Sequence, residues 1–177
     1  MVINKNGGGS FTIKYILDKG LQDISTQSEK DSVIPLNLSE DYLKEVILNR
    51  DDISYDNYII LEENDRTVIS VRFSFKSIEG LNSILPEDNR ISLERDGRST
   101  ILKQGLTNGK QYDINSESLE ILQEIFRDHY FKMRITTPEN ITSINLGVLL
   151  NEKSTEYRVD LIDLLLNPEK NNWIVRW

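Results

Sequence analysis

The stretch RTVISVRFSFKSIEGLNSIL, residues 66–85, changes its hydrophobic period from that of a strand to that of a helix at Ser77. Before Ser77, every second side chain is apolar, which is typical of a strand with one buried face. These alternating residues are Ile69, Val71, Phe73 and Phe75. After Ser77, apolar residues recur at helical spacing. They are Ile78, Leu81, Ile84 and Leu85. Ser77 is a favourable N-cap and Pro86 predicts the end of the helix, so the stretch predicts a half-buried strand leading directly into a short amphipathic helix.

Periodicity along the rest of the chain predicts the α+β class. We expect a mostly antiparallel, twisted sheet of about seven to nine strands, with two or three helices packed on one face. A hairpin is predicted at Asp96-Gly97, because both residue types tolerate the turn conformation. The other expected elements are strands at 10–17, 57–62, 131–135, 143–150, 157–161 and 173–177, a loop at 18–32, a helix capped by Ser39, and a helix from residue 115 or 116.

Length and composition predict one soluble domain. The 177 residues, 38% of them hydrophobic and 28% charged, are typical of a globular protein of single-domain size. No apolar run approaches the roughly 20 residues that a membrane-spanning helix needs. The formal net charge of -8 disfavours nucleic acid as a partner, because neutralising phosphates requires clustered lysine and arginine.

The first nine residues, MVINKNGGG, predict a flexible glycine-rich tether in front of a single domain over residues 10–177. They contain neither the basic segment nor the apolar core of a signal peptide. Two interpretations remain open: a cytosolic protein, or an exported protein whose signal precedes the sequence given. A bacterial lipoprotein carries its acylated cysteine just before such a tether, and this sequence contains no cysteine of its own.

The residue types needed for catalysis are scarce. His129 is the only histidine and there is no cysteine, so a catalytic triad or a multi-histidine metal site would depend on one residue. A histidine at the end of a predicted helix more often interacts favourably with the helix dipole. We therefore expect no enzyme and no cofactor.

One spacing resembles a calcium-binding loop. Oxygen-bearing residues stand at its first, third, fifth and twelfth positions. These residues are Asp52, Ser54, Asp56 and Glu63. Asn57 occupies the position where glycine is expected, and the extended pattern up to Glu62 would move Glu63 away from the loop. Calcium is therefore a weak alternative to the expectation that no metal binds.

The end of the chain carries large apolar side chains. Trp173, Val175 and Trp177 share one face of a predicted terminal strand. Contiguous exposed apolar surface marks a site for a partner or a lipid, whereas buried aromatic residues close a core. The sequence leaves both interpretations open.

Several phrases together resemble the LppM-like bacterial lipoproteins, including relatives in spirochaetes. They are the first strand at 9–17, IPLNLSEDYLKEV (34–46), VISVRFSFKSIEGLNSIL (68–85), FKMRITTPENI (131–141) and NWIVRW (172–177). The resemblance implies a non-enzymatic α+β domain outside the cytoplasm, held to a membrane by an N-terminal lipid, and suggests lipid or glycolipid binding. The mycobacterial form has a C-terminal membrane span with no counterpart after Trp177, so a role that needs the span is not expected here.

The resulting hypothesis is a lipid-anchored lipoprotein on the periplasmic side of a bacterial membrane that binds lipid or an acylated lipoprotein in an apolar groove. A carrier or acceptor resembling the outer-membrane acceptor of the Lol pathway is the sharper form. Each buried methylene contributes about 0.8 kcal/mol, so an acyl chain needs no charged site. The predicted ligand-binding residues are Ile69, Val71, Phe73, Phe75, Ile78, Leu81, Trp173 and Trp177. The alternative is a protein-interaction module of the cell envelope.

Overall fold

A computed structural model gives the fold of this chain and confirms the α+β class. It describes residues 1–18, 44–45, 47, 50–63, 66–85, 87–106, 116–127, 129–167 and 172–177. The predicted loop at 18–32, apart from its first residue, and the predicted cap at Ser39 lie outside the described residues. The chain divides into two compact units. The N-terminal unit comprises residues 4–84 with Val2, and the C-terminal unit comprises residues 85–177 with Met1 and Ile3.

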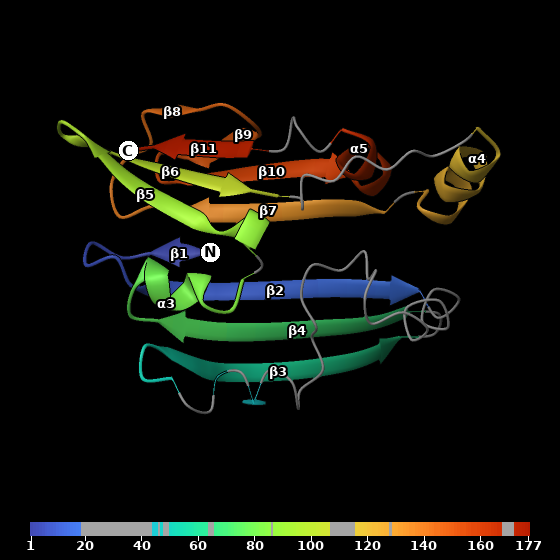
Figure 1. Ribbon diagram of the computed structural model, residues 1–177, viewed down its shortest axis with the longest axis horizontal. Helices are drawn as coiled ribbons and strands as arrows, with labels where there is room; N and C mark the ends of the chain where they lie inside the picture. Colours follow the sequence, from blue (N-terminus) through green and yellow to red (C-terminus); the bar gives the residue numbers. More distant parts are fainter. Residues whose placement is uncertain are drawn as a thin grey trace. The chain divides into compact units, whose positions relative to one another are not determined.

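The sheet of the N-terminal unit is antiparallel, with β4 (Arg66–Phe75) between β3 (Ile53–Glu63) and β2 (Gly9–Asp18) (Figure 1). The segment predicted as a tether contains β1 (Val2–Ile3) and a turn in which the amide of Asn4 donates to the carbonyl of Gly8 at 2.7 Å. Gly9 is the first residue of β2.

The predicted change from strand to helix at Ser77 is confirmed. Val71 and Phe73 on β4 have no exposed surface, and Phe75 is 4% exposed. Helix α3 (Ile78–Asn82) follows, and the Ser77 hydroxyl accepts a hydrogen bond from the amide of Gly80 at 3.1 Å. This cap satisfies one of the backbone amides left without a partner in the first helical turn.

The described strands form one sheet of seven strands, within the predicted seven to nine, and a second sheet of four strands, and the C-terminal unit contributes strands to both. Its strands in the seven-stranded sheet follow the order β7 (Tyr130–Thr136), β10 (Ser154–Asp160), β9 (Val148–Asn151). The other sheet has the order β5 (Ile91–Asp96), β6 (Ser99–Gly105), β11 (Asn172–Arg176), β8 (Ser143–Ile144). The remaining described elements are a 3-10 turn (Glu87–Asn89), α4 (Ser116–Ile125) and α5 (Leu161–Leu166). The hairpin predicted at residue 97 is confirmed between β5 and β6.

The core of the C-terminal unit lies around Trp173. Its side chain has no exposed surface, its ring centroid is 6.1 Å from that of Tyr157 on β10, and its Nε1 donates to the carbonyl of Leu146 at 3.0 Å. Val175 is also fully buried and Trp177 is 7% exposed. The apolar face at the end of the chain is therefore core, and it joins residues from both sheets.

The strand predicted over residues 143–150 is interrupted. Gly147 adopts a φ of +84°, so β8 pairs with β11 while β9 pairs with β10. A Cβ at this position would lie 2.3 Å from the carbonyl oxygen of Glu156. The alternation of apolar residues continues through the glycine, and for this reason periodicity alone does not reveal the break.

We predict that Gly147→Ala lowers the free energy of unfolding by more than about 2 kcal/mol, because a positive φ and a steric overlap with backbone are combined. Gly97→Ala is the matched control: its φ is +63°, but nothing lies within 4 Å of the added Cβ. Urea unfolding of both variants measures the difference. Equal losses would show that the close approach to Glu156 has no energetic consequence.

Candidate functional site

The side chains predicted to bind a ligand belong mainly to the two cores. Six of them lie in the N-terminal unit, on β4 and α3, and the two tryptophans lie in the C-terminal unit. Val71, Phe73, Leu81 and Trp173 have no exposed surface, whereas Ile69 is half-buried. A ligand could touch most of these residues only after the core had opened.

Phe73→Ala is expected to lower the free energy of unfolding by roughly 3–5 kcal/mol, the usual cost of removing a buried phenyl ring. Leu61→Ala, at a side chain that is 54% exposed, should change it by about 1 kcal/mol or less. Urea denaturation followed by circular dichroism compares the two. A loss in Phe73→Ala no larger than that in Leu61→Ala would mean that the Phe73 side chain is not required for the core.

The four residues of the predicted calcium loop do not converge. β3 is extended from Ile53 to Glu63, so Asp52 and Glu63 are separated by on the order of 35 Å. The carboxylate of Asp56 accepts hydrogen bonds from Ser54 and Ser74. Arg72 lies 3.8 Å from the same carboxylate. Among the described residues, no group of three or more acidic or histidine side chains could hold a metal ion.

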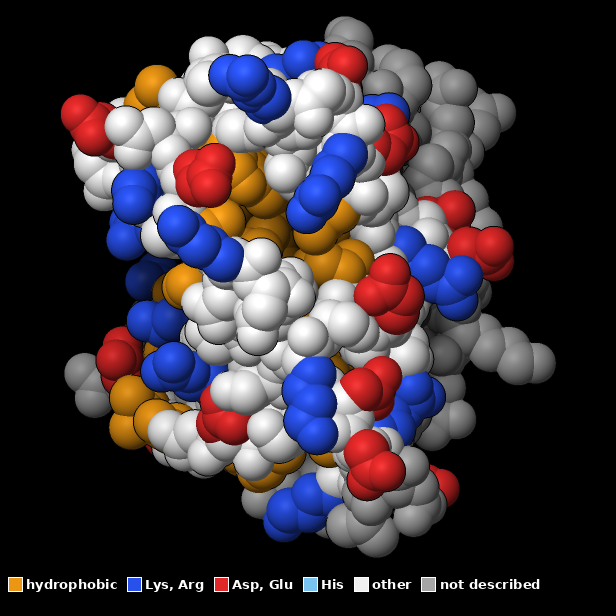
Figure 2. Space-filling view, turned by 90° about the vertical axis from the view of Figure 1, so that its left-hand side faces the viewer, with side chains coloured by type: hydrophobic (Ala, Val, Ile, Leu, Met, Phe, Trp, Pro, Cys, Tyr) orange, Lys and Arg blue, Asp and Glu red, His pale blue; other side chains and the backbone are white. Residues whose placement is uncertain are grey.

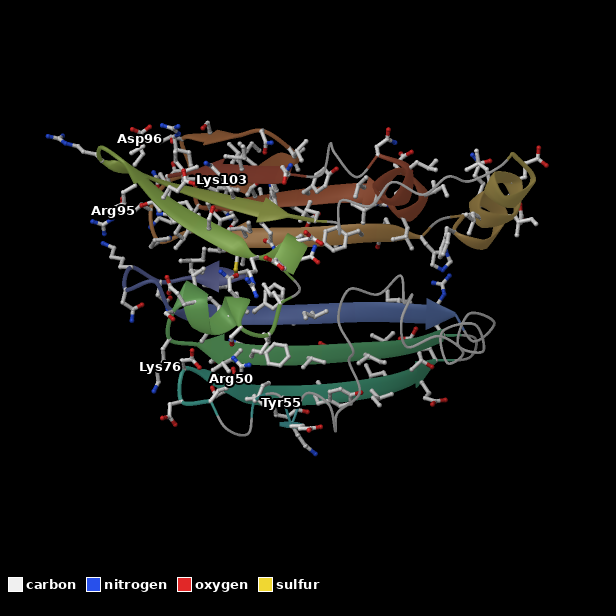
Figure 3. The ribbon with its side chains drawn as sticks, in the orientation of Figure 1. Arg50, Tyr55, Lys76, Arg95, Asp96 and Lys103 are labelled. Carbon is white, nitrogen blue, oxygen red and sulfur yellow. The ribbon has the colours of Figure 1, made fainter. Side chains whose placement is uncertain are left out.

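Asp56 instead marks a β-bulge. The register of β3 against β4 shifts between Tyr55 and Asn57, which leaves Asp56 as the additional residue. Tyr55 lies opposite Phe73, and their rings form an edge-to-face pair with centroids 6.4 Å apart. After the bulge, Tyr58 lies opposite Val71 and so faces the same side. Figure 3 labels Tyr55 on β3. The three-residue spacing of the two tyrosines is the sequence signal of this shift.

Two edge strands carry exposed apolar triplets that the sequence analysis missed. On β3, Ile59, Ile60 and Leu61 are 41%, 51% and 54% exposed. On β9, Val148, Leu149 and Leu150 are 61%, 54% and 44% exposed. Each strand ends the order of its sheet, so no described strand pairs with its outer side. Consecutive apolar residues resemble a buried strand in sequence, and only the topology shows that these lie at an edge.

The outer face of β7 and β10 carries a row of charged side chains. Arg134 lies opposite Glu156 in the ladder, and its Nη2 donates to the Glu156 carboxylate at 2.8 Å. This hydrogen bond, together with the positive charges of Lys132, Arg134 and Arg158, holds the pKa of Glu156 below its usual value. Figure 2 shows basic and acidic side chains interspersed on the face it presents, rather than separated by sign.

Stability should depend on the Glu156 carboxylate in a predictable direction. Because its pKa is lowered by folding, its contribution is present above the unfolded value of 4.5 and is lost as the pH falls through the lower folded value. Glu156→Gln should therefore reduce the free energy of unfolding near neutral pH and have a smaller effect in strong acid. Urea titrations of the wild-type and variant proteins across this pH range measure the loss of unfolding free energy. Arg134→Gln should show the same dependence of that loss on pH. A loss of unfolding free energy in Glu156→Gln that does not change with pH would contradict the stabilising role of the ionised carboxylate.

His129 lies just after α4. Its Nδ1 is 2.9 Å from the carbonyl oxygen of Arg127, and its ring packs edge-to-face with Phe126 at 6.2 Å between centroids. Both contacts are local to the helix end, which fits the structural role expected from the sequence.

No protein-family model, curated protein or solved structure matches this chain. The resemblance to LppM-like lipoproteins therefore stays a prediction. In the described part of the chain, no helix has both the length and the apolar character needed to cross a membrane.

Proposed function

We propose that this chain is a non-enzymatic interaction module of the bacterial envelope that binds a partner by adding a strand to an exposed sheet edge. The observation that carries the proposal is the pair of apolar triplets, residues 59–61 on β3 and 148–150 on β9. Exposed apolar edges promote aggregation, and natural proteins usually protect them with charge, proline or a covering segment. Their exposure on both edge strands favours a use in recognition.

Strand addition fits the chemistry of these edges. The outer side of an edge strand presents amide and carbonyl groups that an extended partner segment can pair with. Successive side chains of a strand point to opposite faces, so a triplet such as Ile59-Ile60-Leu61 offers apolar contact on both faces of the added strand. Backbone pairing would supply affinity, and these side chains would select apolar residues in the partner.

The burial of the predicted ligand-binding residues favours this proposal over acyl-chain binding. Sequestering a lipid with the predicted residues would require Phe73 and Leu81, which have no exposed surface, to separate from their neighbours. Pairing at β3 or β9 requires no change in either core. A lipoprotein carrier remains compatible with edge pairing if the carried protein, rather than its acyl chain, is what is recognised.

The location in the proposal follows from the resemblance. An LppM-like lipoprotein would be held on the periplasmic side of a membrane by a lipid attached upstream of the sequence given. Its partners would then be other envelope proteins with extended apolar segments.

A displayed library of random peptides tests the proposal against the intact chain. We expect selected peptides to be extended and apolar at alternate positions, and their binding should protect amides of β3 or β9 from hydrogen exchange. Ile60→Lys for β3 binders, or Leu149→Lys for β9 binders, should weaken binding at least about tenfold, because a charge would be desolvated at the contact.

Ile121→Lys is the matched control. Ile121 is 55% exposed on α4, so its substitution adds the same charge at an equally exposed apolar position on a helix instead of an edge strand. Binding that falls equally in all three variants, or in none of them, would refute edge recognition. Native mass spectrometry of the purified protein gives the competing outcome: a retained acyl adduct would favour lipid binding.

A further inference from the structure

Two cations face each other across strands β7 and β10. Lys132 lies directly opposite Arg158 in the antiparallel register, on the exposed face of the sheet. Like charges at directly opposed positions destabilise a sheet. In the part of the chain that the structure describes, neither side chain forms an ion pair. The repulsion between the two cations is therefore not offset by a direct ion pair at either of them.

Both cations also lie close to the aromatic ring of Tyr130. The Arg158 guanidinium carbon lies 3.8 Å from the centroid of the Tyr130 ring, and the Lys132 ammonium lies 5.9 Å from it. Tyr130 is 42% exposed. Stacking on Tyr130 orients the guanidinium and reduces the freedom that it would lose on binding a ligand. The three side chains thus form a partly preorganised group open to solvent.

In the described part of the chain, no acidic neighbour forms an ion pair with Lys132 or Arg158. Glu156 is the next residue on the same face of β10, but Arg134 already engages its carboxylate. Asp160 lies opposite Tyr130 at the end of β10, where it is the N-cap residue of α5, although its side chain makes no cap hydrogen bond. Both Lys132 and Arg158 contribute to the lowered pKa of Glu156, so this carboxylate attracts the two cations without forming an ion pair with either.

We propose that Lys132, Arg158 and Tyr130 form a binding site for a phosphate group. A guanidinium offers paired donors that match phosphate oxygens, and an ammonium adds a second charge beside it. A bound dianion would lie between the two cations and convert their repulsion into attraction. The site is on the sheet face, so it does not depend on pairing at the β3 or β9 edges. A soluble phosphate ester and an anionic lipid headgroup share this chemistry.

Chemical-shift titration of the intact chain with inorganic phosphate, against sodium chloride at matched ionic strength, tests the site. Phosphate should shift the amide signals of β7 and β10 saturably, and Lys132→Gln or Arg158→Gln should weaken this binding at least about fivefold. Lys132→Gln should also leave the protein at least as resistant to urea, since it removes a repulsion. Arg95→Gln, at an exposed arginine on the β5-β6 hairpin, is the control (Figure 3).

Vesicles separate the two sources of phosphate. Co-sedimentation with phosphatidylglycerol vesicles, but not with phosphatidylcholine vesicles, that is lost in Arg158→Gln would identify a lipid headgroup. Phosphate binding without co-sedimentation would identify a soluble ester. Shifts that chloride reproduces, binding that Arg95→Gln weakens equally, or no saturable shift at all would each overturn the proposal.

Discussion

The N-terminal unit depends on the complete burial of the Phe73 side chain. Its strand, β4, is paired on both sides, and the ring lies between Phe11 on β2 and Tyr55 on β3 in the ladder. Because Val71 and Phe75 share this face, the alternation of one strand determines which sides of its neighbours turn inward. The cap residue Ser77 follows two residues after the strand ends, and α3 begins at the next residue, with Leu81 buried in the same core. The C-terminal unit has its counterpart in Trp173, which joins two sheets through one side chain.

Features encoded within a short window could be predicted from the sequence. The strand and helix around Ser77, the hairpin at Gly97 and the start of α4 each depend on local periodicity or on turn and cap residues. Features that depend on the pairing of distant segments could not be predicted from the sequence. Periodicity carries through Gly147 although its backbone breaks the strand there, and the assignment of β8 and β9 to different sheets follows from that break.

The candidate sites show the same division. Sequence reasoning selected large apolar residues such as Phe73 and Trp173, and hydrophobicity cannot distinguish a core residue from one that lines a groove. The exposed triplets at residues 59–61 and 148–150 have the composition of buried strands, so only their edge positions reveal them. The opposition of Lys132 and Arg158 joins residues 26 positions apart and is visible only in the register of β7 and β10.

The bulge at Asp56 determines which side chains in the second half of β3 face the core. Ile53 and Tyr55 face the core before it, Tyr58 does so after it, and the one additional residue keeps the two halves of the strand in step. Loss of a single residue here would leave a strand of ordinary length with its second half reversed, placing Ile59 and Leu61 inward and Tyr58 outward. Natural variation in this strand should therefore tolerate the gain or loss of two residues more readily than of one. An insertion or deletion of one residue in this strand of a related chain would then indicate that the chain has gained or lost the bulge.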